Sequence, residues 1–158
     1  MRIGVISDTH GLLRASVFDV FADVDHILHA GDVGSQDIIT ELEGVAPVVA
    51  VYGNADGFDL RDALPRVAKV DLTGLLVTLV HGDEFGLPTP AELADAYPDS
   101  DVVVYGHTHE PLLEIVGDGL TVLNPGAAGP YTKGMPTVAI VEYEPVLPPR
   151  ARIVPLTE

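Results

Sequence analysis

Seven side chains that can bind a metal ion follow five short apolar segments of this sequence. Each segment is followed by a carboxylate, an amide or an imidazole, and none by Lys, Arg or Cys. The seven residues are Asp8, His10, Asp32, Asn54, His81, His107 and His109. Because the strands of open α/β sheets send their loops to a shared carboxyl edge, we expect these donors to meet there.

The chemistry of this set is that of a divalent metal site. Four imidazoles, two carboxylates and one amide form a mixed nitrogen and oxygen set that suits Mn²⁺, Fe²⁺, Ni²⁺ or Zn²⁺. Seven donors exceed the need of one ion that keeps positions open for a substrate. With one bridging carboxylate they suit two ions about 3.5–4 Å apart, which would bind a phosphoryl group and turn a bridging water into a hydroxide nucleophile. The sequence therefore predicts a two-metal phosphoesterase.

Each of these residues also has a structural explanation when it is taken alone. Asp8 and Asp32 could cap the helices that follow their strands, and Asn54 could form a turn. His10 could be an ordinary loop residue. The expected convergence at one sheet edge is what favours a metal site. His26 and His29 lie outside the set and are expected to have structural roles, although His29 is close enough to the ligands to be a candidate for supporting them from behind.

The apolar segments that must position these residues are short and nearly continuous. They cover residues 3–6, 27–28, 48–52, 75–80 and 102–105, and such runs are typical of strands buried on both faces. Helical patterns lie between them, at residues 12–24 and in a segment that Ser35 can cap and Gly44 can end. Thr89 and Pro90 mark the start of another helix, which runs to residue 97. The first half thus predicts a β-α-β-α-β order with parallel crossovers.

The second half of the chain is richer in strands. Further strands are predicted at residues 66–72, 112–116, 120–123, 136–143 and 150–155, with hairpin turns at 71–74 and 117–119. Residues 55–63 and 144–149 are expected to be loops. We infer an α/β fold of two packed mixed β-sheets flanked by helices, a four-layer αββα sandwich. Residues 1–158 are expected to form a single domain.

The composition argues against several other classes of protein. There are 24 acidic and 8 basic residues, for a formal net charge of −16, so neither extended nucleic-acid binding nor membrane binding is expected. The sequence has no cysteine, which excludes disulfides and thiolate metal sites. The opening residues do not fit a signal peptide and no apolar run approaches a membrane span, so we expect a cytoplasmic protein. Bound cations would supply the positive charge that a phosphate ester needs.

The motifs resemble those of the calcineurin-like metallophosphoesterases. The matching blocks are Asp8-Thr9-His10, Gly31-Asp32, Gly53-Asn54, His81-Gly82 and Gly106-His107-Thr108-His109, and Asn124-Pro125-Gly126-Ala127 is similar to a further loop of the family. The compact length resembles that of the small bacterial and archaeal phosphodiesterases, a branch that also includes the retromer scaffold subunit. The family fold of two β-sheets between helices agrees with the expectation above.

The resemblance also implies how the ligands are shared. One ion would be held by Asp8, His10, Asp32 and His109. The other would be held by Asp32, Asn54, His81 and His107, with Asp32 bridging, and these four are the residues that we expect to be catalytic. Mn²⁺ is the expected ion, with Ni²⁺, Fe²⁺ or Zn²⁺ as alternatives.

Ala55 departs from the pattern of the wider family, in which a histidine thought to protonate the leaving group follows Asn54. A positioned general acid contributes roughly 10²–10⁴-fold. Its absence favours a small organic or nucleotide phosphodiester, or a substrate with a good leaving group.

Two other functions are open to a chain with this resemblance. One is a phosphomonoesterase, which the absence of an acid at Ala55 disfavours. The other is a non-catalytic scaffold that binds partner proteins, in which the ligand set is expected to be eroded, whereas here it is complete. Apolar residues in the predicted rim loops, such as Phe58 and Leu87, could line a pocket or bury a contact between copies of the chain.

Overall fold

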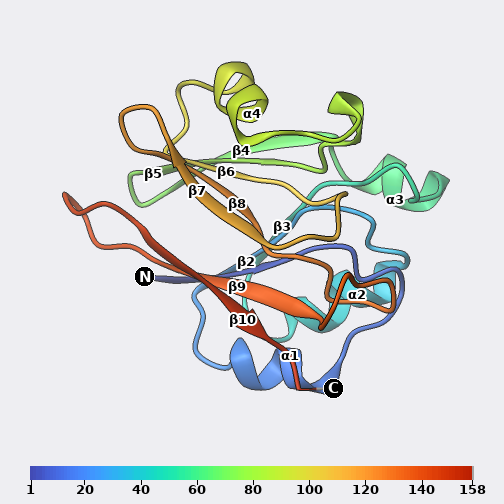
Figure 1. Cartoon of the computed structure of the whole chain (residues 1–158). Helices are drawn as coiled ribbons and strands as arrows, with labels where there is room; N and C mark the ends of the chain where they lie inside the picture. The colour runs from blue at the N-terminus through green and yellow to red at the C-terminus, as the bar shows by residue number, and fades with distance from the viewer. Residues whose placement is uncertain (158) are drawn as a thin grey trace.

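Two five-stranded β-sheets form the frame of the computed structural model, which describes residues 1–157 (Figure 1). The first sheet has the order β10-β9-β1-β2-β3, and the second has the order β4-β5-β6-β8-β7. The strands are β1 (Arg2–Ile6), β2 (His26–His29), β3 (Val48–Ala50), β4 (Val67–Leu72), β5 (Leu75–Val80), β6 (Val102–Val104), β7 (Leu112–Val116), β8 (Leu120–Asn124), β9 (Thr137–Glu142) and β10 (Arg150–Pro155). Both sheets are mixed, because parallel strands β1-β2-β3 and β5-β6-β8 are joined by antiparallel neighbours.

Helices cover the outer faces of the two sheets (Figure 1). Helices α1 (Ala15–Val20) and α2 (Gln36–Glu43) pack on the first sheet, and α4 (Pro90–Ala96) packs on the second. The short helix α3 (Phe58–Ala63) and the 3₁₀ turn η1 (Asp83–Phe85) lie in connections between strands. This arrangement confirms the predicted αββα sandwich of four layers.

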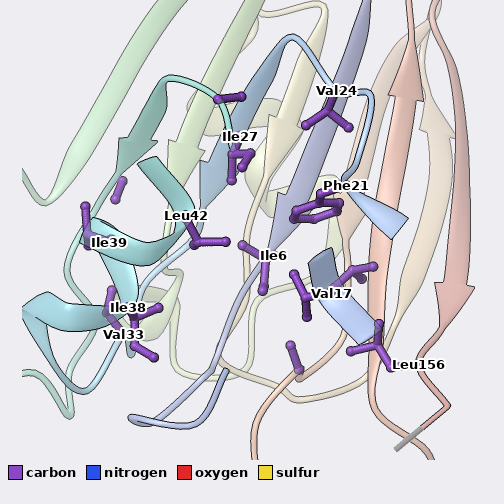
Figure 2. Packing of buried hydrophobic residues seen from close by; sticks show 14 of the residues in the cluster. Ile6, Val17, Phe21, Val24, Ile27, Val33, Ile38, Ile39, Leu42 and Leu156 are labelled. Carbon is purple, nitrogen blue, oxygen red and sulfur yellow. The ribbon is translucent and has the colours of Figure 1, made fainter. Parts of the chain in front are cut away.

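Three apolar clusters hold the four layers together. Val5, Leu28 and Leu79 belong to the cluster between the two sheets. Ile6 and Phe21 belong to the cluster under α1 and α2, which Figure 2 shows from close by. Successive residues of β1 therefore face opposite layers, as the pleat of a strand requires, and this explains why the segment reads as a continuous apolar run.

The helices differ from the expected ones in two places. The helix predicted at residues 12–24 is shorter, because Arg14 has extended backbone angles and its guanidinium donates to the carbonyls of Ala128 and Gly129. Residues before Ala15 therefore belong to the loop that carries His10. The expected loop at residues 55–63 contains α3, of which only Leu60 is buried, so its apolar pattern was too weak to predict a helix.

The predicted helix starts at Ser35 and Thr89 are confirmed. Ser35 Oγ accepts a hydrogen bond from the Asp37 amide, and Thr89 and Glu92 form a reciprocal capping box. Within residues 1–157, no helix is long and apolar enough to cross a membrane.

Candidate metal centre

Loops from both sheets meet at one end of the sandwich and carry the predicted ligands. Asp8 and His10 follow β1, Asp32 follows β2, and Asn54 follows β3. His81 follows β5, whereas His107 and His109 follow β6. Backbone hydrogen bonds join neighbouring loops, from the Asp8 amide to the Gly31 carbonyl at 3.0 Å and from the His10 amide to the Asp32 carbonyl at 3.0 Å. The Gly106 amide likewise donates to the His81 carbonyl at 3.0 Å, and the His107 amide donates to Asp8 Oδ2, so the loops of the two sheets form one connected rim.

Five of the seven side chains converge on a small volume. Asp8 Oδ1 lies 3.2 Å from His109 Nε2, 3.8 Å from His10 Nε2 and 3.9 Å from His81 Nε2. Asp32 Oδ2 lies 3.2 Å from His81 Nε2 and 3.6 Å from His10 Nε2. Two groups suited to a metal result, Asp8 with His10 and His109, and Asp8 with Asp32 and His81.

His107 and Asn54 lie at the edge of these groups. The ring of His107 contacts that of His81 edge-on, with 5.2 Å between centroids, and its backbone amide donates to Asp8 Oδ2 at 3.2 Å. Asn54 is exposed, and its backbone carbonyl accepts a hydrogen bond from Arg61. The bridging role of Asp32 and the part that Asn54 and His107 play in holding an ion stay predictions.

The backbone at the ligands adopts a conformation that side chains normally avoid. Asp8, His10, Asp32, His107 and His109 have φ values of 56°, 45°, 51°, 70° and 64°. Left-handed backbone costs an L-residue with a side chain about 1–2 kcal/mol. Such strain accumulates at functional sites, where the surrounding structure over-determines the conformation. Its concentration on five candidate ligands makes this rim the candidate functional site.

Buried polar atoms at the centre lack hydrogen-bond partners. Asp8 Oδ1, His10 Nε2 and His81 Nε2 are buried, and none has a hydrogen-bond partner among the described residues. A buried polar group without a partner costs about 1–3 kcal/mol. These atoms come from the same converging residues, so the donor set fits a bound divalent cation.

The pKa values of His81 and Asp32 also fit a site that binds a divalent cation. Burial by itself lowers the pKa of His81, but its close contact with Asp32 and the charges of Asp8 and Asp32 outweigh burial and raise the pKa to about 9. Burial by itself raises the pKa of Asp32, but its close contact with His81, the hydrogen bond from the Ala55 amide and the charge of His10 lower it overall. Without a metal, the proton on His81 thus partly balances two buried carboxylates.

The close contact with Asp8 likewise raises the pKa of His109, against a smaller effect of burial. The raised pKa values of His81 and His109 show that the buried carboxylates favour positive charge at this centre, as a cation site requires.

His29, for which the sequence favours a structural role, supports the ligand loops from behind. Its Nε2 lies 2.9 Å from Thr9 Oγ1, and its Nδ1 accepts a hydrogen bond from the Gly31 amide. Burial lowers the pKa of His29 to about 4, so the ring is neutral near pH 7. A neutral ring can accept at Nδ1 and donate at Nε2, which matches both contacts.

Sequence reasoning did not identify the supporting roles of Ser7 and Tyr131. Ser7 Oγ donates to Asp8 Oδ2 at 2.6 Å, and the ring of Tyr131 contacts that of His10 edge-on at 5.1 Å. Ser7 directly precedes Asp8, a signal that was available in the sequence. Tyr131 is more than 120 residues from His10 in the chain, so only the fold brings the two rings together.

Comparison with known proteins identifies the family to which this chain is similar. Residues 1–145 match the model of the calcineurin-like phosphoesterase superfamily domain. A probable metallophosphoesterase of Methanothermobacter thermautotrophicus is 42% identical over 134 residues, with 80% of this chain and 77% of that protein covered. A phosphodiesterase of Methanocaldococcus jannaschii is 34% identical, with 91% and 94% covered.

Solved structures of similar fold support the same assignment. The structure described as a novel archaeal phosphodiesterase has a TM-score of 0.77 and 32% identity, and 98% of this chain and 100% of that chain are covered. Vps29 of Chaetomium thermophilum has a TM-score of 0.81 with 16% identity, covering 100% and 97%, and at that identity it shows the fold alone. The chain belongs to the calcineurin-like phosphoesterase superfamily.

Proposed function

We propose that this protein is a divalent-metal-dependent phosphodiesterase that binds two ions and acts on a small organic or nucleotide phosphodiester. Two observations carry this proposal: five candidate ligands have a left-handed backbone, and three candidate ligands, Asp8, His10 and His81, have a buried atom that lacks a hydrogen bond. A strained and unsatisfied arrangement of this kind is retained when it serves a ligand. Relatives described as phosphodiesterases support the reaction class.

The proposed ligand sets are those that the family resemblance implies. Asp8, His10, Asp32 and His109 hold one ion, and Asp32, Asn54, His81 and His107 hold the other. When bound, a pair of Mn²⁺ ions supplies positive charge for the phosphoryl oxygens and lowers the pKa of an attacking water.

The chain's own residues orient this centre. Ser7 and the His107 amide both donate to Asp8 Oδ2, which leaves Asp8 Oδ1 directed at the histidines. His81 Nδ1 lies 2.8 Å from the Ala30 carbonyl, so this carbonyl holds the proton of the neutral ring on Nδ1 and keeps Nε2 free to bind.

The surroundings of Ala55 favour diesters with good leaving groups. Ala55 is exposed at the rim, and its backbone amide donates to Asp32 Oδ1 at 2.8 Å. An alanine side chain cannot protonate a departing alkoxide, so a poor leaving group is expected to leave slowly. An aryl phosphodiester, whose leaving group needs no acid, is therefore the test substrate of choice.

The test compares rates on an aryl phosphodiester and on the matching phosphomonoester after removal of metal and addition of Mn²⁺. We expect hydrolysis that needs the ion and favours the diester, and a loss of at least about 100-fold in Asp32→Asn, since metal ions contribute several kcal/mol. Asp19→Asn, which removes an exposed carboxylate of α1, is the matched control and keeps the full rate.

Several outcomes would count against the proposal. Hydrolysis that survives in chelator would contradict a metal-dependent mechanism. A monoester that reacts much faster than the diester would instead make the protein a phosphomonoesterase. A metal-loaded protein that hydrolyses neither substrate would favour a scaffold role.

A further inference from the structure

Asp56 is a buried carboxylate that binds backbone amides instead of a cation. The residue is 4% exposed, and within the described residues it forms no ion pair. Its Oδ2 accepts from the amides of Val33 at 3.2 Å and Gly53 at 2.9 Å, and its Oδ1 accepts from the amide of Gly34 at 2.9 Å. Val33 and Gly34 directly follow Asp32, whereas Gly53 directly precedes Asn54. One side chain thus joins the loops that carry two proposed ligands of the same ion.

Arg61 holds the outer side of the same loop. Its Nε donates to the Asp56 carbonyl at 2.7 Å, and its Nη2 donates to the Asn54 carbonyl at 2.9 Å. The guanidinium lies over the ring of Tyr52, 5.3 Å from its centroid. These contacts position a side chain of α3 against the turn at Asn54, and a planar guanidinium fork suits two carbonyls at once.

The loop that Asp56 and Arg61 hold reaches the proposed bridging carboxylate directly. The Ala55 amide donates to Asp32 Oδ1 at 2.8 Å, while Asp32 Oδ2 faces His81 and His10. A displacement of the Asn54 turn would therefore change the orientation of Asp32 as well as the position of Asn54. Asp8, His10 and His109, the other three proposed ligands of the first ion, form no side-chain hydrogen bond with this turn among the described residues.

We infer that Asp56 and Arg61 are positioning residues that form the second ion position by fixing the Asn54 turn against Asp32. This inference rests on the proposed two-ion centre and assigns a task to residues outside it. Hydrogen bonds behind metal ligands typically change metal affinity by about 10–100-fold when they are removed. Loss of Asp56 or Arg61 is therefore expected to weaken the second ion selectively.

The experiment titrates metal-free protein with Mn²⁺ and follows it by calorimetry and electron paramagnetic resonance. Wild type is expected to take up two ions and to give the signal of a coupled pair. Arg61→Gln and Asp56→Asn are expected to bind the first ion within about threefold of wild type and the second at least about tenfold more weakly. Their spectra at intermediate Mn²⁺ should then show isolated Mn²⁺.

Three controls separate positioning from general damage to the fold. Asp62→Asn removes an exposed carboxylate of the same helix and should behave as wild type. Arg61→Lys keeps the charge without the fork and should resemble Arg61→Gln. The unfolding temperature of each metal-free variant shows whether folding is intact, and Arg61→Gln, which changes an exposed side chain, keeps the test valid if Asp56→Asn does not fold.

Selective weakening of the second ion supports the inference. Two ions bound with wild-type affinity in both variants would overturn it while leaving the proposed function intact. Equal weakening of both ions in step with a lower unfolding temperature would also overturn it, because the residues would then only stabilise the fold. Wild type that binds fewer than two ions would overturn the proposed two-ion centre and this inference together.

Discussion

At the residue scale, glycines next to the ligands allow the loops to approach one another closely. A Cβ on Gly53 would lie 2.5 Å from the backbone nitrogen of Asp32 and closer still to its Oδ1. A Cβ on Gly106 would lie 2.6 Å from Asp8 Oδ2. The Gly-Asn and Gly-His blocks of the sequence therefore have a steric cause, since only glycine leaves room for the neighbouring carboxylate.

Gly53→Ala is expected to damage the centre, whereas Gly57→Ala in the same segment is not, because a Cβ at Gly57 meets nothing within 4 Å. The clash at Asp32 should cost about 1–3 kcal/mol of stability and lower Mn²⁺ affinity. Urea unfolding and metal titration of both variants check this. Equal behaviour of the two variants would contradict the steric explanation.

The left-handed backbone at His10 gives a second residue-scale prediction. Both His10→Gly and His10→Ala remove a proposed ligand and the ring contact with Tyr131, but only glycine accepts a φ of 45° without strain. The metal-free glycine variant should be more stable than the alanine variant by about 0.5–1 kcal/mol, because relief of strain exceeds the added entropy of the unfolded chain. Urea unfolding measures the difference, and an alanine variant of equal or higher stability would argue against strain.

The raised pKa of His81 makes metal binding compete with protons. Its pKa of about 9 lies above the ordinary value of 6.5, so the proton stabilises the metal-free fold fully below pH 6.5, and this contribution is lost as the pH rises through 9. A histidine must be neutral to bind a metal. Mn²⁺ uptake at pH 7.5 should therefore release about one proton or more per chain.

Calorimetry of this uptake in two buffers with different ionisation enthalpies counts the protons. His81→Asn should release fewer protons than wild type, and the release by wild type should decrease above pH 9. A binding heat that does not depend on the buffer would show that His81 is already neutral in the metal-free protein.

At the element scale, the strands and the ends of the strands could be predicted from the sequence, whereas the short connecting helices could not. Buried strands such as β1 and β6 are recognisable in the sequence as apolar runs, and the candidate metal ligands follow shortly after these runs. Helix α3 buries one residue, so it leaves no periodic pattern. The contact of Tyr131 with His10 and the contacts of Asp56 with the amides of Val33 and Gly34 join residues distant in the chain, which local patterns do not report.

For helix α4 we predict a substitution that lowers the stability of the protein but leaves its activity unchanged. Its capping box joins Thr89 and Glu92, and Leu93 packs on the outer face of the second sheet with Val103 and Val122. Thr89→Ala should cost about 0.5–2 kcal/mol of stability and leave the rate on an aryl phosphodiester unchanged. Thermal unfolding and a rate measurement on the same sample check both parts, and a lower rate in the folded variant would connect α4 to the centre.

At the scale of the whole molecule, the net charge of −16 opposes the binding of an anionic substrate. The centre itself contains Asp8 and Asp32, and the nearby Arg61 is bound to backbone carbonyls. Two divalent cations at the rim would reverse the local sign of the charge and attract a phosphodiester. On the proposed function, an acidic protein of this kind depends on its bound ions to attract an anionic substrate.

The most direct test of the two-ion account measures the rate on an aryl phosphodiester against the number of Mn²⁺ ions bound per chain. The account predicts little hydrolysis up to one equivalent and a steep rise as the second ion binds, since two ions together bind the phosphoryl oxygens and activate the water. Full activity with one bound ion, or activity that persists in chelator, would contradict it.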